Sequence, residues 1–353
     1  MKKLWFAMLL SLALLFSGCS GTEVTSVGGT VSETAALEIH FLDVGQADAA
    51  LILCNGDAML IDGGNAADGD NVVASIQRCG VDTLTAVVST HSDEDHLGGL
   101  PDVLEAYPVE TLYATGIPAD TKIYREFCDI AAAKGLELTA PAAGSSFALG
   151  GSTVTFLGPL SEASNPNNNS VVLRIDYGDT SFLFTGDAMN KEEKELVESG
   201  ADLDADVLKV AHHGGEESSS YVFLREAMPE YAVISVGADN KYGHPTEAVL
   251  SRLRDAGATV YRTDELGEIL CRSDGTHIAF SNETGSAMPT AESNATKEHP
   301  AVAEDEAYVG NLNSKKFHRS DCAYLPEEQN AIYFATREEA MAQGYEPCGR
   351  CKP

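Results

Sequence analysis

The chain has 353 residues, of which 44% are hydrophobic, and its formal net charge is −31 at pH 7. This length and composition allow one large core or two smaller ones. Most of the negative charge lies in residues 37–281, which excludes the non-specific attraction to nucleic acid that Lys and Arg provide. Chemistry on phosphate groups in this segment therefore requires bound cations, which carboxylate-rich sites attract.

The first 36 residues indicate export. Two lysines precede the apolar run 4–16, which is shorter than a membrane-spanning helix and is typical of a signal peptide. The run ends in LLFSGCS, which resembles a bacterial lipobox. This predicts a signal peptide over residues 1–18, lipidation of Cys19, and a polar tether over residues 19–36. The protein is then a membrane lipoprotein that faces outside; a plain secretory signal is the alternative, and it also predicts export.

Residues 37–281 alternate between strand and helix patterns, which indicates one α/β domain. Two strand-rich halves, each with helices, predict a sandwich with its helices outside. Residues 282–306 are polar and form a predicted flexible linker before a small unit at residues 307–353. The expected strands are 37–44, 49–54, 58–62, 84–91, 205–214, 231–237 and 259–281, with a hairpin at 170–187, and the expected helices are 70–80, 120–135, 190–199, 221–227 and 245–257.

Ionisable residues lie at the ends of four expected strands or directly after them. They are Asp62 in MLIDGGN, the cluster THSDEDHLGG at residues 90–99, Asp187 in LFTGDA, and His212 with His213 in LKVAHHGG. Strands hold ligands rigidly, and glycines let the backbone approach an ion. Burying several carboxylates without a cation is strongly unfavourable, so the joint pattern predicts a metal site.

These motifs also carry a family resemblance. FLDVGQADAALI, IDGG, THSDEDHLGG, NNNSVVLRI, FTGDA, DVLKVAHHGG and NKYGHP occur in that order over residues 37–281. This order resembles the metallo-β-lactamase fold and, more narrowly, the ComEC-like competence-protein hydrolase domain. The resemblance implies a four-layer αββα sandwich of the α/β class with a metal site at one edge.

The resemblance also implies where the metal ligands lie. His91 and Asp93 take the first metal position, and Asp187 bridges to the second. One of two adjacent histidines completes the second position. We favour His212 because it falls first after the strand, while His213 orients it or contacts the substrate. The implied ligands are His91 and Asp93 at the first position, Asp95, His96 and His212 at the second, and Asp187 between them.

Two departures from the broad fold affect the expected ion. Asn168, Asn169 and Ser170 stand where the fold usually has a further histidine, as they do in the ComEC-like subgroup, and this weakens the first position. Asp93 replaces a histidine of many relatives, which favours Mn²⁺ or Mg²⁺ over Zn²⁺. We therefore expect one or two divalent ions, Mn²⁺ or Zn²⁺, with Mg²⁺ as a further candidate. Asp62 is expected to contact a metal ligand and not the metal itself, and Asn169 is expected to contact a ligand or the substrate.

The implied activity is hydrolysis of a phosphodiester by metal-activated water, with extracellular DNA as the favoured substrate. Asp95 is the candidate that orients the nucleophile, and His244 in YGHPTEAVL either contacts a phosphate oxygen or only precedes a helix. Ser218, Ser219 and Ser220 either donate to phosphate or cap the helix that follows. The alternatives are a metallo-hydrolase of a small ester, lactone or phosphate, and a DNA-binding surface lipoprotein with weak or no catalysis. No protein partner is inferred.

The small unit at residues 307–353 contains three cysteines and a histidine in two pairs, HRSDC and CGRC, which predicts a closed Zn²⁺ site. It resembles the zinc module of the Ada methyl-phosphotriester repair protein, with a histidine in place of the first cysteine, so a structural zinc is expected and methyl transfer is not. A disulfide within CGRC is the alternative. The predicted zinc ligands are His318, Cys322, Cys348 and Cys351; Cys54, Cys79, Cys128 and Cys271 remain as thiols or as up to two disulfides.

Overall fold

The protein is described by a computed structural model over residues 36–282, 285–288, 308–319, 322, 324–326, 330–334 and 337–348. Several predicted features lie outside the described residues. They are the signal peptide, the lipidation site Cys19, most of the polar tether and of the flexible linker, and the zinc ligand Cys351.

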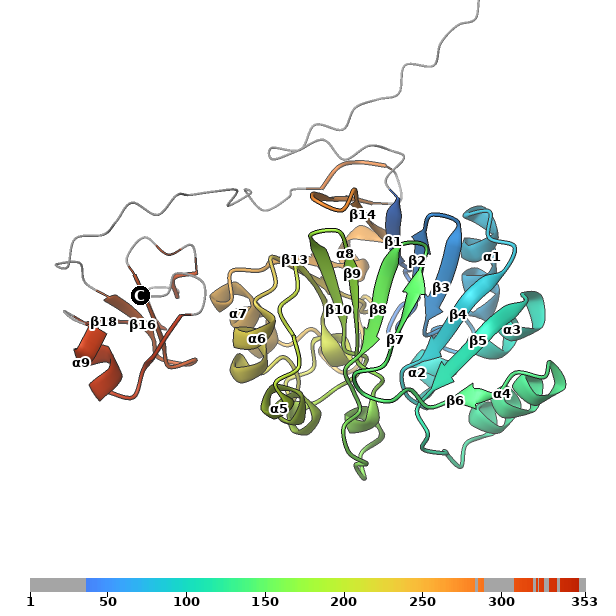
Figure 1. Cartoon of the computed structure of the whole chain (residues 1–353), viewed down its shortest axis with the longest axis horizontal. Coiled ribbons are helices and arrows are strands. Elements are labelled where there is room, and N and C mark those ends of the chain that lie inside the picture. The colour runs from blue at the N-terminus through green and yellow to red at the C-terminus, as the bar shows by residue number, and fades with distance from the viewer. Residues whose placement is uncertain are drawn as a thin grey trace, which may run out of the picture.

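Two mixed sheets pack face to face in the large domain (Figure 1). The strands of the first sheet are β1 (Leu37–Phe41), β2 (Ala50–Cys54), β3 (Asp57–Ile61), β4 (Leu84–Ser89), β5 (Val109–Ala114), β6 (Leu138–Thr139), β14 (Ile269–Ser273) and β15 (Ile278–Asn282). The strands of the second sheet are β7 (Ser146–Leu149), β8 (Ser152–Phe156), β9 (Leu173–Tyr177), β10 (Thr180–Phe184), β11 (Val207–Lys209), β12 (Tyr231–Ile234) and β13 (Thr259–Arg262). Their orders are β15-β14-β1-β2-β3-β4-β5-β6 and β13-β12-β11-β10-β9-β8-β7.

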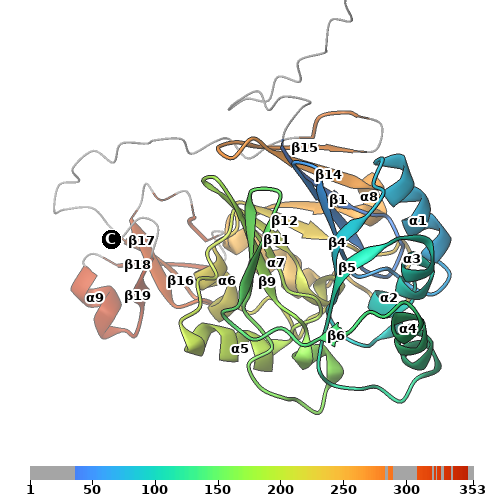
Figure 2. The same ribbon diagram turned by 45° about the vertical axis from the view of Figure 1, so that its right-hand side comes forward.

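Helices cover the outer face of each sheet, which gives the four-layer αββα sandwich (Figure 2). On the first sheet lie α1 (Gly69–Arg78), α2 (Glu94–Leu97), α3 (Leu100–Ala106) and α4 (Lys122–Ala133), and on the second α5 (Asn190–Ser199), α6 (Tyr221–Ala227) and α7 (Glu247–Asp255). Three apolar layers result, one between the sheets and one under each set of helices.

Neighbouring residues of a central strand point into different apolar layers. On β4, Val88 packs between the sheets, whereas Val87 packs under the first set of helices. On β10, Phe182 and Leu183 divide in the same way. Strands that are buried on both faces are therefore nearly continuous apolar runs in the sequence.

Two expected elements differ from the structure. The segment 259–281 is interrupted by α8 (Thr263–Leu266), and β14 and β15 leave the second sheet to pair with β1 and extend the first. Strand β11 ends at Lys209, earlier than expected, because the chain turns there into the short helix η2 (Ala211–Gly214). This turn places two histidines at the end of β11.

The C-terminal module has its own small sheet and core. Its strands β16 (Tyr308–Asn311), β17 (Lys316–Arg319), β18 (Ala331–Phe334) and β19 (Glu346–Pro347) have the order β18-β16-β17-β19, beside α9 (Arg337–Ala342). Phe317, Phe334, Ala340 and Tyr345 form its core. The Nδ2 atom of Asn330 lies 3.5 Å from Asp255 Oδ2 at the end of α7, which brings the module against the large domain. Among the described residues, no helix has the length and apolar character needed to cross a membrane.

Candidate metal centre

The charged motifs meet at one edge of the sandwich, where strands from both sheets end. Asp62 follows β3 and His91 follows β4, while Asp187 follows β10 and the His212–His213 pair follows β11. Asp62, His212 and His213 have positive φ angles of 58°, 52° and 52°. Such left-handed conformations are unfavourable for these residues and cluster at functional sites, where surrounding contacts hold them.

Glycines bring two of these loops into contact. A Cβ atom on Gly99, in HLGG, would collide with the carbonyl oxygen of Gly63, in IDGG. A Cβ atom on Gly98 would likewise collide with the backbone nitrogen of Ala66. The two motifs therefore need glycine because their backbones touch, and this contact fixes the loop that carries His91 and His96.

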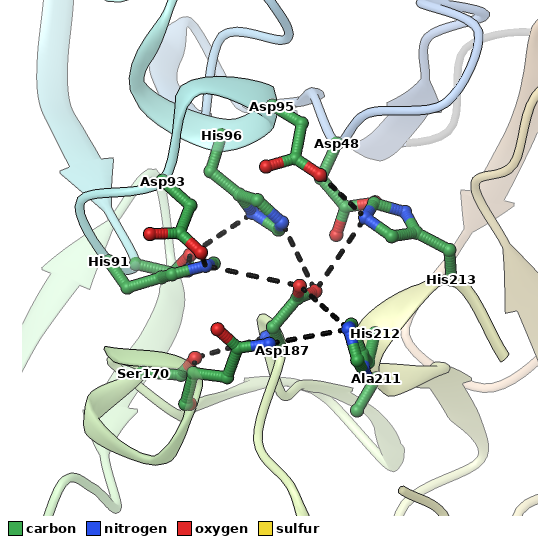
Figure 3. Close-up of polar contacts among 12 residues, drawn as sticks. Asp48, His91, Asp93, Asp95, His96, Ser170, Asp187, Ala211, His212 and His213 are labelled. Atoms are coloured by element: carbon green, nitrogen blue, oxygen red, sulfur yellow. Dashed lines mark hydrogen bonds and ion pairs between the residues drawn. The ribbon is translucent and has the colours of Figure 1, made fainter. Parts of the chain in front are cut away.

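Asp187 lies at the middle of the centre, and its two carboxylate oxygens face different histidines (Figure 3). Oδ1 is 3.1 Å from His96 Nε2 and 3.9 Å from His213 Nε2. Oδ2 is 3.9 Å from both His91 Nε2 and His212 Nε2. One carboxylate thus stands between two sets of possible ligands.

We call His91, Asp93 and His212 the first ligand group, and Asp95, His96 and His213 the second. In the first group, His91 Nε2 lies 3.8 Å from Asp93 Oδ2. In the second, His213 Nε2 lies 3.3 Å from Asp95 Oδ2. Together with Asp187, the second group offers four ligand atoms that all lie within 4.8 Å of one another.

The positions of the two adjacent histidines differ from the sequence-based preference. His213, and not His212, lies with Asp95 and His96 in the second group. His212 lies near the other oxygen of Asp187, Oδ2. Its Nε2 atom is 3.3 Å from Asn167 Nδ2. His212 therefore adds a second imidazole to the first ligand group, in which the Asn168–Ser170 segment contributes none.

The buried atoms of the centre fit a cation. Four atoms are buried and make no hydrogen bond of regular geometry within the described part of the chain, although two of them, His96 Nε2 and Asp187 Oδ1, lie 3.1 Å apart: His91 Nε2, His96 Nε2, His213 Nε2 and Asp187 Oδ1. Buried polar atoms normally have partners, and leaving several unpaired in one place costs free energy. Imidazole nitrogens and carboxylate oxygens are suitable ligands for Zn²⁺ and Mn²⁺. An ion between these atoms would satisfy all of them.

Burial and neighbouring charges act in opposite directions on these groups. Burial lowers the pKa of His213, but the surrounding carboxylates, above all Asp187, raise it to about 10. The same two effects leave the pKa of His96 well above its ordinary value. Burial raises the pKa of Asp187, but His96 and His213 hold it well below its usual range. Without an ion, protons on the two histidines balance the carboxylates, so cation binding must release protons.

Asp62 lies behind His96 and points to its Nδ1 atom at 2.8 Å. The carboxylate also accepts hydrogen bonds from the amide and the hydroxyl of Thr90, at 2.8 Å and 2.7 Å. Asp62 is thereby fixed, and it orients His96 with Nε2 turned towards Asp187. Carboxylates in this position set the orientation and basicity of a metal-binding histidine.

Asp62→Ala should weaken Mn²⁺ binding by about 10–100-fold, because His96 loses the partner that orients its ring. Titration calorimetry on chelator-stripped protein measures the effect. Asp43→Ala, an exposed carboxylate on the loop after β1, is the control and should leave the affinity unchanged. Equal affinities for the two variants would contradict the role of Asp62.

A buried ion pair behind the second ligand group was not predicted from the sequence. Lys209 Nζ lies 2.6 Å from Asp48 Oδ2, and both side chains are buried. Asp48 Oδ1 lies 3.3 Å from His213 Nδ1, which also contacts Ser235 O at 3.0 Å. Burial raises the pKa of Asp48, but Lys209 and His213 hold it well below its usual range. The pair therefore orients His213 as Asp62 orients His96.

The asparagine and serine residues that follow Asn165 shape the floor of the centre. The Asn169 side chain accepts from Ala163 N at 2.7 Å and donates to Ala163 O at 2.9 Å, and these contacts hold it to its own loop. Ser170 Oγ accepts a hydrogen bond from the Asp187 amide at 3.0 Å. Ser170 and Asn167 are thus the residues of this segment that reach the centre.

The three serines after η2 have structural partners. Ser220 caps α6 by accepting from Phe223 N at 3.3 Å, and Ser218 Oγ donates to Ala211 O and Gly215 O. The amides of Ser219 and Ser220 donate to the buried carboxylate of Glu193. Of the two predicted roles, the helix cap is the one that the structure shows for Ser220.

His244 lies beside the first ligand group. Its ring centroid is 5.3 Å from that of His212, and its buried Nδ1 atom has no hydrogen bond to any residue that the structure describes. Burial and the neighbouring His212 lower the pKa of His244 to about 4. At neutral pH it is therefore an uncharged imidazole that can donate one hydrogen bond.

A second group of metal-binding residues lies in the C-terminal module. His318, Cys322 and Cys348 have ligand atoms within 4.8 Å of one another, and His318 Nδ1 is 3.4 Å from Cys322 Sγ. The predicted fourth ligand, Cys351, lies outside the described residues. In the large domain, Cys54, Cys79, Cys128 and Cys271 form no disulfide among the described residues.

Two packed sheets whose strand ends deliver histidine and aspartate ligands define a metal-dependent hydrolase. The family model of the Metallo-beta-lactamase superfamily matches residues 42–238, and the chain belongs to that superfamily. A second family model, described as the Metal binding domain of Ada, matches residues 291–353. The fold, the divalent-metal chemistry of the large domain and the metal-binding character of the C-terminal module thus agree with the sequence-based expectations.

Three relatives are named for competence or recombination. ComE operon protein 3 of Bacillus subtilis (strain 168) is 32% identical over 200 residues, 55% of this chain and 25% of that protein. Competence protein ComA of Neisseria gonorrhoeae is 38% identical over 231 residues, 64% of this chain and 31% of that protein. Recombination protein 2 of Haemophilus influenzae (strain ATCC 51907 / DSM 11121 / KW20 / Rd) is 31% identical over 238 residues, 66% of this chain and 28% of that protein. The chain spans less than a third of the length of each.

Proposed function

We propose that this protein hydrolyses phosphodiester bonds of DNA outside the cell, held at the membrane by a lipid on Cys19. The relatives named for competence and recombination support DNA as the substrate. The arrangement of the centre supports phosphodiester chemistry, because two ligand groups that share Asp187 can hold two cations against one phosphate. The acidic surface of the domain makes those cations necessary.

The residues of the centre divide into a buried set and a set open to solvent. His91, His96 and Asp187 are buried, whereas the side chains of Asp93 and Asp95 are 44% and 30% exposed. Divalent cations held there would neutralise phosphate oxygens and lower the pKa of the attacking water. The substrate therefore approaches from the side of Asp93 and Asp95, and Asp95 can accept a hydrogen bond from the water and orient it towards phosphorus.

His244 lies next to His212 of the first ligand group. Because its pKa is lowered to about 4, it stays neutral and donates a hydrogen bond to a phosphate or leaving oxygen without supplying positive charge. Positive charge has to come from the cations and from Lys241, on the same loop. This arrangement supports a role of His244 in positioning the phosphate, with the activation of water left to the ligand groups.

A row of aromatic rings beside the first ligand group favours DNA over a small ester as the substrate. The His244 ring lies 5.3 Å from His212 and 5.7 Å from Tyr242, which stacks on it at an interplanar angle of 29°. Tyr242 is 57% exposed, and Lys241 Nζ lies 4.9 Å from its ring centroid. An exposed ring beside a lysine is a surface on which a nucleobase stacks while its phosphate meets the cation. A small ester or lactone needs no such extension of the site.

The test compares a single-stranded oligonucleotide with a small chromogenic phosphodiester in the presence of Mn²⁺ or Zn²⁺. Tyr242→Ala should raise the KM for the oligonucleotide by about 5–150-fold, the equivalent of about 1–3 kcal/mol of stacking, and should leave the small diester unaffected. Tyr333→Ala, on an exposed tyrosine of the C-terminal module, is the control. Asp95→Asn should abolish cleavage of both substrates.

Three results would overturn the proposal. Intact DNA together with hydrolysis of lactones or small esters would assign a small substrate. Retardation of DNA without cleavage would assign a binding role. Cleavage by Asp95→Asn at the rate of the unchanged protein would remove the assigned centre from the reaction.

A further inference from the structure

Outside the metal centre, Cys79 belongs to a half-buried cluster of charged residues. It follows α1 directly, and its Sγ atom lies 3.8 Å from His40 Nε2 on β1. On the other side of the ring, His40 Nδ1 contacts Glu268 Oε1 at 2.7 Å. Glu38 Oε2 lies 3.6 Å from His40 Nε2. A thiol, an imidazole and a carboxylate are thus in contact in series.

Two arginines complete the cluster and fix its carboxylates. Arg78 Nη2 lies 2.6 Å from Glu268 Oε2, and Arg272 Nε lies 3.0 Å from Glu38 Oε1. Each carboxylate therefore has one oxygen on an arginine and the other facing His40. The Cys79 cluster is formed by Glu38, His40, Arg78, Cys79, Glu268 and Arg272.

His40 is a cation in this setting. Burial lowers its pKa, but hydrogen bonds to Cys79, Glu268 and Glu38 raise it to about 11. The cluster then holds three positive groups against two carboxylates. The sulfur of Cys79 thus lies next to a cationic group, and cysteines in such positions are the reactive ones in proteins.

Cys79 differs from a neighbouring cysteine, Cys54, in its exposure. Cys79 is partly exposed and borders a groove with Glu38, Asp57 and Asp82. Cys54 borders the same groove, but it is buried, its Sγ donates to Gly150 O at 3.3 Å, and burial raises the pKa of its thiol. Of these two sulfurs, only Cys79 combines access with a cationic partner.

The backbone around Cys79 decides between two kinds of chemistry. The amides of Cys79, Gly80 and Val81 donate to carbonyls of residues 75–77, at 3.1, 3.0 and 3.3 Å. None of these three amides is therefore available to stabilise the oxyanion that acyl transfer requires. Thiol–disulfide exchange places negative charge only on sulfur and needs no such donors.

We propose that Cys79 is a site of thiol–disulfide exchange for small neutral or cationic disulfides. The Cys79 thiol gives its proton to solvent, and its sulfur attacks one sulfur of the disulfide. The disulfide bond breaks, a mixed disulfide forms on Cys79, and the other half leaves as a thiolate that takes a proton from solvent. The disulfide is the oxidant, and no other reactant is needed. The groove carboxylates Asp57 and Asp82 disfavour anionic disulfides.

The experiment treats the full chain with cystamine, which is cationic, or with 3,3′-dithiodipropionate, which is anionic, and follows the adduct on each cysteine by peptide mass spectrometry. Cys79 should react about tenfold faster than Cys128, a partly exposed thiol on α4 whose neighbour is Tyr124, and faster with cystamine than with the anion. His40→Gln should slow the reaction of Cys79 about tenfold, and Cys128 serves as the internal reference.

Glu268→Gln provides a second variant in case His40→Gln disturbs the fold. It should also slow the reaction of Cys79 with the disulfide, because His40 loses a carboxylate partner. Equal rates at Cys79 and Cys128, or an unchanged Cys79 rate in both variants, would overturn the proposal. Faster reaction with dithiodipropionate would overturn the assigned class of disulfide. None of these outcomes depends on the metal centre, so they test Cys79 separately from the proposed hydrolysis of DNA.

Discussion

Asp187→Asn should lower both bound metal and hydrolase activity by more than about 100-fold. Loss of a residue that merely orients a ligand already costs about 10–100-fold, and Asp187 stands between both ligand groups. Its Oδ1 faces His96 and its Oδ2 faces His91, so the amide nitrogen of asparagine must point towards one imidazole nitrogen that needs a cation. At least one ligand group loses its shared oxygen.

The measurement pairs elemental analysis of the purified protein with turnover of a small chromogenic phosphodiester. Asp179→Asn is the matched control, because Asp179 lies on the exposed turn of the same β9–β10 hairpin. Its metal content and turnover should equal those of the unchanged protein. Retention of full metal content and turnover by Asp187→Asn would refute the shared position of this carboxylate.

Lys209→Met should destabilise the large domain by about 3–5 kcal/mol. The Lys209–Asp48 pair is buried, and removal of one partner from a buried pair leaves the other charge uncompensated. His213 remains 3.3 Å from Asp48 and offsets part of the loss, so we expect the lower end of the range. Denaturant unfolding of chelator-treated protein, followed by circular dichroism, measures the change in the free energy of unfolding.

Two further variants show whether the buried charge causes this loss. Lys194→Met removes an exposed lysine that pairs with Glu198 at 3.6 Å, and such surface pairs contribute only about 0–1 kcal/mol. Adding Asp48→Asn to Lys209→Met removes the orphaned carboxylate and should recover much of the stability. If Lys209→Met unfolds like Lys194→Met, the pair does not stabilise the domain.

The parts of the centre that the sequence predicts are those fixed by short motifs. His91, Asp95 and His96 lie on one turn after a strand, so their proximity follows from local spacing alone. Asp187 could be placed between the metal positions only through the family resemblance, because the sequence does not specify how β10 lies across from β4. The pairing of β14 with β1, more than 200 residues apart in the chain, is of the same non-local kind.

The roles of His212 and His213 depend on a backbone feature that spacing does not reveal. Both residues have positive φ, so the alternation of side chains along β11 does not continue into them. The turn sends His213 to the second ligand group and His212 to the first. Asp48 and Lys209 were not predicted because each is a single charge within an apolar run, and their contact joins the loop before β2 of the first sheet to β11 of the second.

The centre takes ligands from both sheets, and this has a consequence for folding. The first sheet supplies His91 to His96, and the second supplies Asp187, His212 and His213. An ion bound by both would cross-link the sandwich, and the unfolded chain offers no such arrangement. At an ion concentration 100 times its Kd, this linkage adds about 2.7 kcal/mol to the free energy of unfolding. The supply of metal would then set the fraction of the domain that is folded, as well as whether it reacts.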